Sequence, residues 1–169
     1  LTVTVNRADL NQVMMGDLPA GAREQRAVLR ALNESGLFAE VHYNDASASQ
    51  SLHAAICAML MGDAEYARNI LPAHRTTLRS GSAWRTGPFK TLGKSNTNDA
   101  CGYWVYDDFA LLNGLAGYHY LSERAGNREE AEWAAKEFQS LHDALNELHR
   151  WAAKETGHEF LLTDKGNNK

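Results

Sequence analysis

The sequence predicts an all-α protein made of antiparallel helical hairpins, of the α/α-toroid or α-solenoid type, with a short extended segment at its N-terminus. Apolar residues recur at helical spacing through most of the chain after residue 20, and glycines stand where these patterns stop. Only three prolines interrupt the sequence. With 169 residues, 1–169 has the length of a single helical-hairpin domain, which could also be a fragment of a larger α/α-toroid.

The first third of the chain predicts two helices. Residues 1–5 alternate between apolar and polar side chains as a strand does, and a first helix is predicted at 22–35. Residues 37–43 are short and alternating, which indicates an extended connector. A second helix is predicted at 47–62 because its apolar residues form one broad face.

The rest of the chain predicts three further helices and one long loop. The third helix should begin after Asp63, and Pro72 should kink or divide it because proline lacks the donor that a helix interior needs. Residues 80–102 are rich in glycine, serine, threonine and asparagine, and long loops of this kind are often functional. The last two helices are predicted at 104–125 and 128–155.

Two turns between helices share one pattern of residues. Gly62-Asp63 and Gly126-Asn127 each combine a glycine for the left-handed C′ position with a side chain that caps the next helix. Asn127 with Glu130 also fits a capping box. The two glycines lie 64 residues apart (126 − 62), which indicates a duplicated helical hairpin.

Two segments carry a resemblance to a known family. The first reads Asn44-Asp45-Ala46-Ser47, an apolar helix, then Gly62-Asp63-Ala64-Glu65-Tyr66-Ala67-Arg68; the second reads Glu129-Glu130-Ala131-Glu132-Trp133, followed by Leu141, Ala144, Leu145 and Asn146. Across residues 40–160 the pattern resembles the helical pairs of six-hairpin, (α/α)6-barrel glycosidases. The resemblance implies inner and outer helices that alternate, a sugar cleft formed by helix-entrance loops on one face, and a chain that supplies roughly half of a barrel.

The carboxylates at the start of helix 104–125 are the first candidates for chemistry. Glycoside hydrolysis needs two carboxyl groups, about 5–10 Å apart, on either side of the scissile bond. Asp107 and Asp108 are neighbours on a helix and do not aim at one point, so one would act as acid or base and Asp45 or Asp99 would supply its partner. The alternative is that both aspartates simply favour the helix dipole.

Aromatic side chains gather in the same part of the sequence. Trp84-Arg85 in the predicted loop, together with Tyr103, Trp104 and Tyr106, would form platforms for sugar rings, because an aromatic face buries the apolar side of a pyranose. The alternative is that the helical aromatics are core residues.

Charge and motif content exclude several function classes. A formal net charge of −4 and a pI near 6.0 argue against nucleic acid as a partner, and no run of 18 apolar residues is present to span a membrane. His142-Asp143 lacks the ligand spacing of a metal site, and the alternating charges of 128–137, Glu130 among them, indicate a solvent-facing surface. We therefore expect no metal and no cofactor. Cys57 and Cys101 fit either free thiols or one disulfide.

Two functions of different classes fit these residues. We expect first a carbohydrate-active hydrolase that acts on a carbohydrate substrate through paired carboxylates. The alternative is a small all-α protein-binding module, such as a toxin-neutralising immunity protein or a repeat-type adaptor, whose aromatic and acidic surface binds a protein partner. The chain begins at Leu1 and ends shortly after the apolar Phe160-Leu161-Leu162, which fits either a complete domain or a piece of a longer chain.

Overall fold

The computed structural model of the protein describes residues 12, 14–24, 55, 56, 58, 59, 64–97 and 100–159, and most of these are helical. The long helices are α4 (Ala64–Ala83), α5 (Val105–Arg124) and α6 (Arg128–Thr156). Between α4 and α5 lie the single turn η1 (Pro88–Lys90) and two short antiparallel strands, β1 (Ser95–Thr97) and β2 (Ala100–Gly102). The predicted predominance of helix is confirmed, whereas the strand pair lies in the segment that the sequence predicts as loop.

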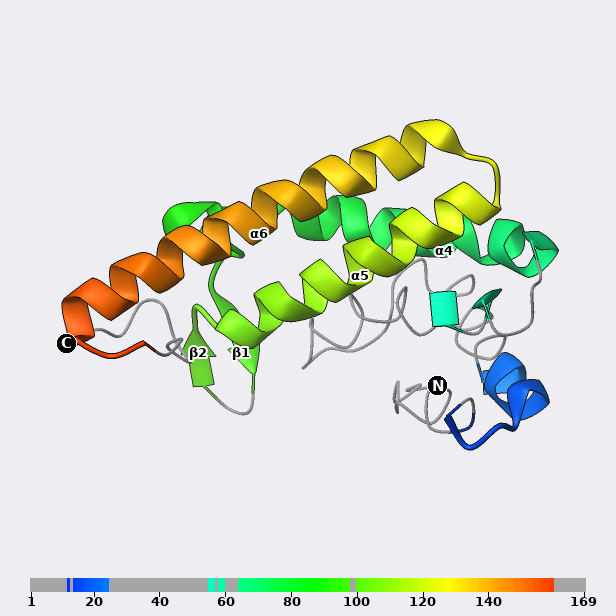
Figure 1. The fold of residues 1–169 in the computed structure, drawn as a ribbon, viewed down its shortest axis with the longest axis horizontal. Coiled ribbons are helices and arrows are strands. Elements are labelled where there is room, and N and C mark those ends of the chain that lie inside the picture. Colours follow the sequence, from blue (N-terminus) through cyan, green and yellow to red (C-terminus); the bar gives the residue numbers. More distant parts are fainter. Residues whose placement is uncertain are drawn as a thin grey trace.

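Helix α5 packs against both α4 and α6. Helices α5 and α6 run in opposite directions and are joined by a short turn (Figure 1). Gly126 adopts a left-handed conformation in this turn (φ 76°), and the side chain of Asn127 accepts a hydrogen bond from the backbone N–H of Glu130 at 3.3 Å. Both features of this turn were predicted, because a glycine and a capping residue are what a tight helix–helix connection needs.

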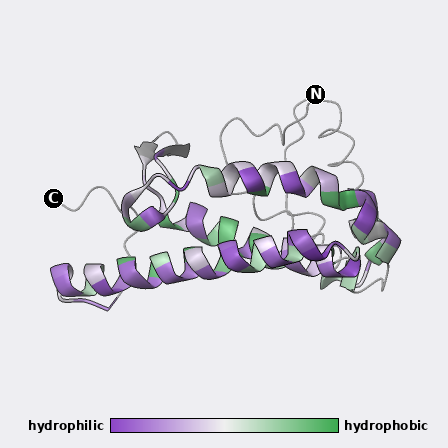
Figure 2. Cartoon of the chain, turned by 90° about the horizontal axis from the view of Figure 1, so that it is seen from above, coloured by the Kyte–Doolittle hydropathy of each residue, from purple (hydrophilic) through white to green (hydrophobic). Residues whose placement is uncertain are grey.

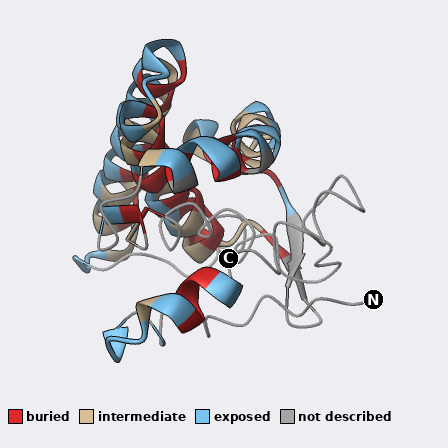
Figure 3. Ribbon diagram, turned by 90° about the vertical axis from the view of Figure 1, so that its right-hand side faces the viewer, coloured by how far each residue is buried: buried red, intermediate tan, exposed pale blue. Residues whose placement is uncertain are grey.

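The core lies where the three helices face one another, as the buried residues in Figure 3 show. Helix α6 alternates between hydrophilic and hydrophobic residues along its length (Figure 2), so that its apolar residues form one stripe. Helix α4 is amphipathic in the same way, whereas α5 carries apolar or small residues around most of its circumference. The largest fully buried apolar side chains are Ile70, Leu78, Leu111, Leu115, Tyr118, Leu121, Leu141 and Leu148.

Helix α4 differs from the prediction in two ways. It continues as one helix through Pro72, so of the two alternatives the division is wrong, whereas the kink stays a prediction. Pro72 and Arg68, four residues earlier, are both exposed, so the turn that lacks a helical donor lies on the solvent side of α4. The helix also ends at Ala83, so the loop begins at 84 rather than 80.

The later helix boundaries agree with the sequence to within one residue, and Gly157 ends α6 in a left-handed conformation (φ 71°). Near the N-terminus, residues 18–24 are helical, and Asp17 caps this helix by accepting a hydrogen bond from the N–H of Ala20 at 3.0 Å. This start lies four residues before the predicted one (22 − 18). Outside the described residues lie the predicted segments 1–5 and 37–43 and the turn at Gly62-Asp63.

Candidate functional site

The α5 entrance (residues 103–108) holds most of the residues that the sequence singles out for chemistry. Trp104 is the N-cap of α5, with extended backbone and no capping hydrogen bond from its side chain. Asp107 and Asp108 follow in the first turn, where the positive end of the helix dipole favours negative charge. Both carboxylates are buried: Asp107 is 2% exposed and Asp108 is fully covered.

The carboxylate of Asp108 holds the loop that precedes the strands. Its Oδ1 atom accepts a hydrogen bond from the backbone N–H of Leu92 at 2.7 Å, and this contact is buried. A charged acceptor at this distance makes a strong bond to a backbone donor. Asp108 therefore connects the α5 entrance to the chain segment that follows α4.

The aromatic residues of the α5 entrance are half-buried. Tyr103, Trp104 and Tyr106 all keep part of their surface in solvent. The rings of Trp104 and Tyr106 form a tilted pair with centroids 6.4 Å apart. These residues thus form a packed aromatic pair with accessible surface, and the two buried carboxylates follow them in sequence. The arrangement is intermediate between the sugar platform and the core role that the sequence leaves open.

Trp84 and Arg85 begin the 84–93 loop. The backbone N–H of Gly93 donates to the carbonyl of Trp84 at 3.0 Å, so the two ends of the loop meet. The half-buried indole of Trp84 lies against Gly93, where a Cβ atom would come within 2.9 Å of the indole nitrogen. A side chain at 93 would therefore push the indole away from the position it occupies.

The guanidinium of Arg85 points to α6 rather than to the α5 entrance. It donates to the carbonyl of Lys90 at 2.8 Å, to Glu137 at 3.3 Å and to Ser140 at 3.1 Å. Its side chain is only 9% exposed. Arg85 therefore holds the loop against α6. The sequence groups Arg85 with Tyr103, Trp104 and Tyr106, but its guanidinium does not point toward them.

The predicted partner carboxylates, Asp45 and Asp99, lie outside the described residues. Within the described residues, no group of three or more His, Cys, Asp or Glu side chains is placed to hold a metal ion. His142 lies 3.7 Å from Asp143, but both side chains are about half exposed or more, and the imidazole stacks on Phe138. Among the helices that the structure describes, none is long and apolar enough to cross a membrane.

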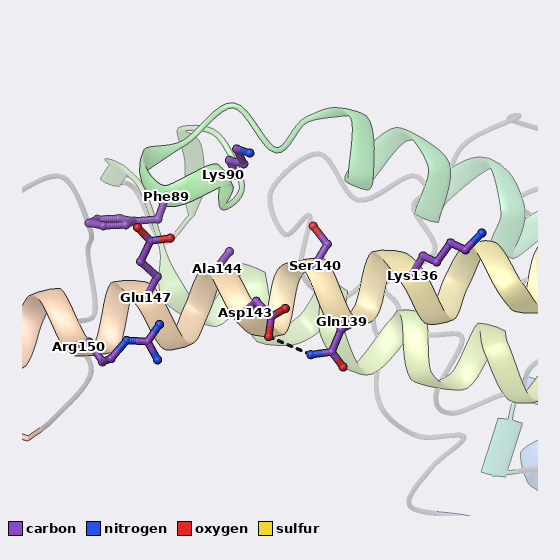
Figure 4. Close-up of a pocket in the computed structure, with 9 residues that line it drawn as sticks. All are labelled: Phe89, Lys90, Lys136, Gln139, Ser140, Asp143, Ala144, Glu147 and Arg150. Atoms are coloured by element: carbon purple, nitrogen blue, oxygen red, sulfur yellow. Dashed lines mark hydrogen bonds between the residues drawn. The ribbon is translucent and has the colours of Figure 1, made fainter.

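A groove of about 740 Å³ lies between the 84–93 loop and α6 (Figure 4). Phe89 lies beside Glu147 at one end of it, and Lys136 lies at the other end. The sequence did not reveal this groove, because most of its α6 residues read as an ordinary solvent-facing surface. The lining residues are Phe89, Lys90, Lys136, Gln139, Ser140, Asp143, Ala144, Glu147 and Arg150.

Glu130 is a second feature that the sequence did not reveal, and its expected place on a solvent-facing surface is wrong. It is 3% exposed, and its carboxylate accepts hydrogen bonds from Arg75 at 3.0 Å, Arg79 at 2.8 Å and Tyr118 at 2.9 Å. Arg79 also lies 4.0 Å from the centre of the Trp133 ring, a cation–π contact. One carboxylate thus joins α4, α5 and α6.

The environment shifts the pKa of both acidic groups in this cluster. Burial opposes the charged form of Glu130, but the hydrogen bonds from Arg79 and Tyr118 and the charges of Arg79 and Arg75 outweigh it, so its pKa lies below the usual 4.5. Burial, and then the contact with Glu130, raise the pKa of the Tyr118 hydroxyl well above its usual 10.0. Both groups therefore keep their ordinary protonation states at neutral pH, which indicates a structural cluster.

Comparison with known proteins gives no relative for this chain: no protein-family model, curated protein or solved structure matches it. The arguments on function therefore depend on the residues and their geometry.

Proposed function

We propose that the chain forms part of a carbohydrate-active hydrolase built from antiparallel helical hairpins, with α5 as an inner helix and its entrance as the sugar site. The character of the helices supports this. Helices α4 and α6 are amphipathic, as outer helices are, whereas α5 is apolar around most of its circumference, as a helix covered on several sides is. The order outer, inner, outer is the alternation expected of an α/α-toroid.

The observation that carries the proposal is the pair of buried carboxylates in the first turn of α5, which directly follows in sequence the half-buried pair of rings formed by Trp104 and Tyr106. A carboxyl group withdrawn from bulk water among aromatic side chains is the setting in which glycosidases keep their general acid. Asp108 already accepts the Leu92 N–H. We assign the acid role to Asp107 because Asp108 is fully covered, whereas Asp107 keeps a small part of its surface in solvent.

The reaction needs a second carboxylate, for which Asp45 is the candidate. Asp107 would donate its proton to the glycosidic oxygen as the bond from this oxygen to the anomeric carbon breaks. In an inverting enzyme the second carboxylate takes a proton from the attacking water; in a retaining enzyme it attacks the anomeric carbon itself, and water later releases the sugar. Tyr103, Trp104 and Tyr106 would contact the sugar rings. Since Asp107 is 2% exposed, sugar binding must open the entrance.

A screen of the purified protein tests this proposal. Reducing-sugar release is measured with α- and β-linked gluco-, manno- and xylo-oligosaccharides, for the wild type and for Asp107→Asn and Asp108→Asn. We expect Asp107→Asn to lower the rate by about 100-fold or more without unfolding the protein. Asp108→Asn keeps an oxygen acceptor for Leu92 and serves as the matched control.

Each remaining outcome contradicts part of the proposal. Unchanged turnover in Asp107→Asn removes this residue from the mechanism, and loss of activity in Asp108→Asn alone transfers the role to Asp108. If the wild type hydrolyses no oligosaccharide in the screen, the hydrolase assignment is wrong and the protein-binding module becomes the better account.

A further inference from the structure

The 84–93 loop is held in one conformation by its own hydrogen bonds. Its ends meet through the bond from Gly93 N–H to the Trp84 carbonyl, which makes it a compact loop of the Ω type. Arg85 closes the loop from inside by donating to the Lys90 carbonyl, and its guanidinium fixes the loop to α6. Side chains carried by this loop therefore have a defined position over α6.

Phe89 and Lys90 hold a backbone conformation that non-glycine residues rarely adopt. Their φ angles are 59° and 62°, both in the left-handed region. Strain of this kind persists only when the surrounding structure compensates for it, and it gathers at binding sites. Here it places Phe89 and Lys90 side by side on the rim of the groove, with the Phe89 ring packed on Trp151 at a centroid distance of 5.5 Å.

The groove offers donors and acceptors in similar number. Lys90, Lys136 and Arg150 are donors, and the carboxylates of Asp143 and Glu147 are acceptors. An anionic ligand would meet the two carboxylates, and a cationic one would meet the ammonium and guanidinium groups. A neutral ligand with many hydroxyls can use both kinds of partner.

The groove is also long. Lys136 and Arg150 line its α6 side and are fourteen residues apart (150 − 136), about 21 Å along a helix axis. Among its lining residues only Phe89 and Ala144 are apolar, and the aliphatic parts of the polar side chains supply the rest of its apolar surface. An extended peptide would need a strand edge or several apolar pockets, and α6 supplies neither here. One aromatic ring among polar side chains suits the apolar face of a sugar.

We propose that the groove between the 84–93 loop and α6 is a second binding site, for an extended neutral oligosaccharide, with the Phe89 ring as its stacking platform. The choice of a sugar rests on the proposed function, whereas the location rests on the loop and on α6. The site is distinct from the α5 entrance, because its residues come from α6 and the tip of the loop.

Calorimetric titration of the full chain with maltohexaose, cellohexaose, xylohexaose and mannohexaose tests the inference. We expect one of these hexasaccharides to bind, with an affinity that falls about tenfold in Phe89→Gly, because glycine accepts the backbone conformation and removes only the ring. Phe89→Tyr keeps the ring and should keep the affinity. Glu147→Gln should weaken binding, whereas Glu129→Gln, on the same helix but outside the groove, should not.

Three results would overturn the inference: none of the four hexasaccharides binds, the affinity is the same in Phe89→Gly and Glu147→Gln as in the wild type, or a sulfated hexasaccharide or an extended hexapeptide binds in their place. Titration of Asp107→Asn separates this site from the proposed active site. Sugar binding without any hydrolysis supports the groove as a binding site and contradicts the hydrolase function. Hydrolysis together with a sugar affinity that does not change in Phe89→Gly supports the hydrolase function and contradicts the groove.

Discussion

The carboxylate of Glu130, in the first turn of α6, accepts a hydrogen bond from the hydroxyl of Tyr118 in α5 at 2.9 Å. The same carboxylate accepts hydrogen bonds from Arg75 and Arg79 in α4. Three donors satisfy one buried charge, which is the condition under which burial of a carboxylate is tolerated. This single side chain thus links α4 to both other helices, in addition to the apolar packing of α4 on α5.

Glu130→Gln should destabilise the fold by about 2 kcal/mol, since it leaves two arginines without their charged partner. This loss is smaller than for a fully buried ion pair because the Arg75 and Arg79 side chains are 59% and 38% exposed and partly hydrated. The free energy of unfolding in urea measures the loss.

The neighbouring Glu129 provides the matched control. It occupies the same first turn of α6 but is exposed. Glu129→Gln should therefore change the free energy of unfolding by less than about 0.5 kcal/mol. Equal losses in the two variants would mean that Glu130 stabilises the fold through its interaction with the helix dipole and not through the buried cluster.

Stability should fall in acid because of Glu130. Its pKa is lower in the folded protein than in the unfolded chain, where the usual value of 4.5 applies. The unfolded state therefore binds this proton first as the pH falls, so the contribution of Glu130 is present above pH 4.5 and is lost below it. Unfolding measured from pH 7 to pH 3 should show the gap between wild type and Glu130→Gln narrowing. A constant gap would contradict a lowered pKa.

The stability of the protein should also fall at alkaline pH because of Tyr118. Its pKa is raised in the folded protein above the usual 10.0, so the unfolded chain loses this proton first as the pH rises. The stability that Tyr118 contributes is complete below pH 10 and declines above it. Tyr118→Phe should remove this decline, at a cost of about 1 kcal/mol at neutral pH for the lost hydrogen bond. Free energies of unfolding at pH 7, 9 and 10.5 compare the two proteins, and parallel curves would rule out the assignment.

The sequence predicted the helices from 104 onward well because their signals are local. A glycine in a left-handed turn, the Asn127 cap and apolar residues at helical spacing act within a few residues, and each is found at the expected position. Pro72 does not divide α4, because the cost of a proline depends on whether its side of the helix faces solvent, which spacing alone does not reveal.

The site was harder to predict because its contacts join residues far apart in the chain. Glu130 lies 55 residues from Arg75, and Asp108 lies 16 residues from Leu92. The sequence placed Glu130 among alternating charges, although it lies one helical turn before the buried Ala134 on the same face of α6. The position of Glu130 on the apolar face of α6, together with two arginines four residues apart in α4, was the signal in the sequence for a buried ion pair.

Asp108→Ala should destabilise the protein by about 1–2 kcal/mol, because it leaves the buried N–H of Leu92 without the carboxylate acceptor. Asp108→Asn keeps an oxygen in the same place and should lose clearly less. Urea unfolding of the two variants tests the structural role of this aspartate independently of any activity. Similar losses in both would show that the negative charge near the helix dipole, and not the hydrogen bond, provides the stability.

Lys90→Gly should stabilise the protein and weaken the binding of the hexasaccharide in the groove. Lys90 is exposed and holds φ at 62°, a conformation that costs a non-glycine residue about 1–2 kcal/mol and glycine almost nothing. Glycine gives back part of this gain through the entropy of the unfolded chain, so we expect a net stabilisation of about 0.5–1 kcal/mol. The carbonyl that accepts the Arg85 hydrogen bond is unchanged by the substitution. Because the substitution also removes the Lys90 ammonium, which lines the groove, the more stable variant should bind the hexasaccharide more weakly. A variant that gains stability and keeps full affinity would show that the Lys90 side chain has no part in binding.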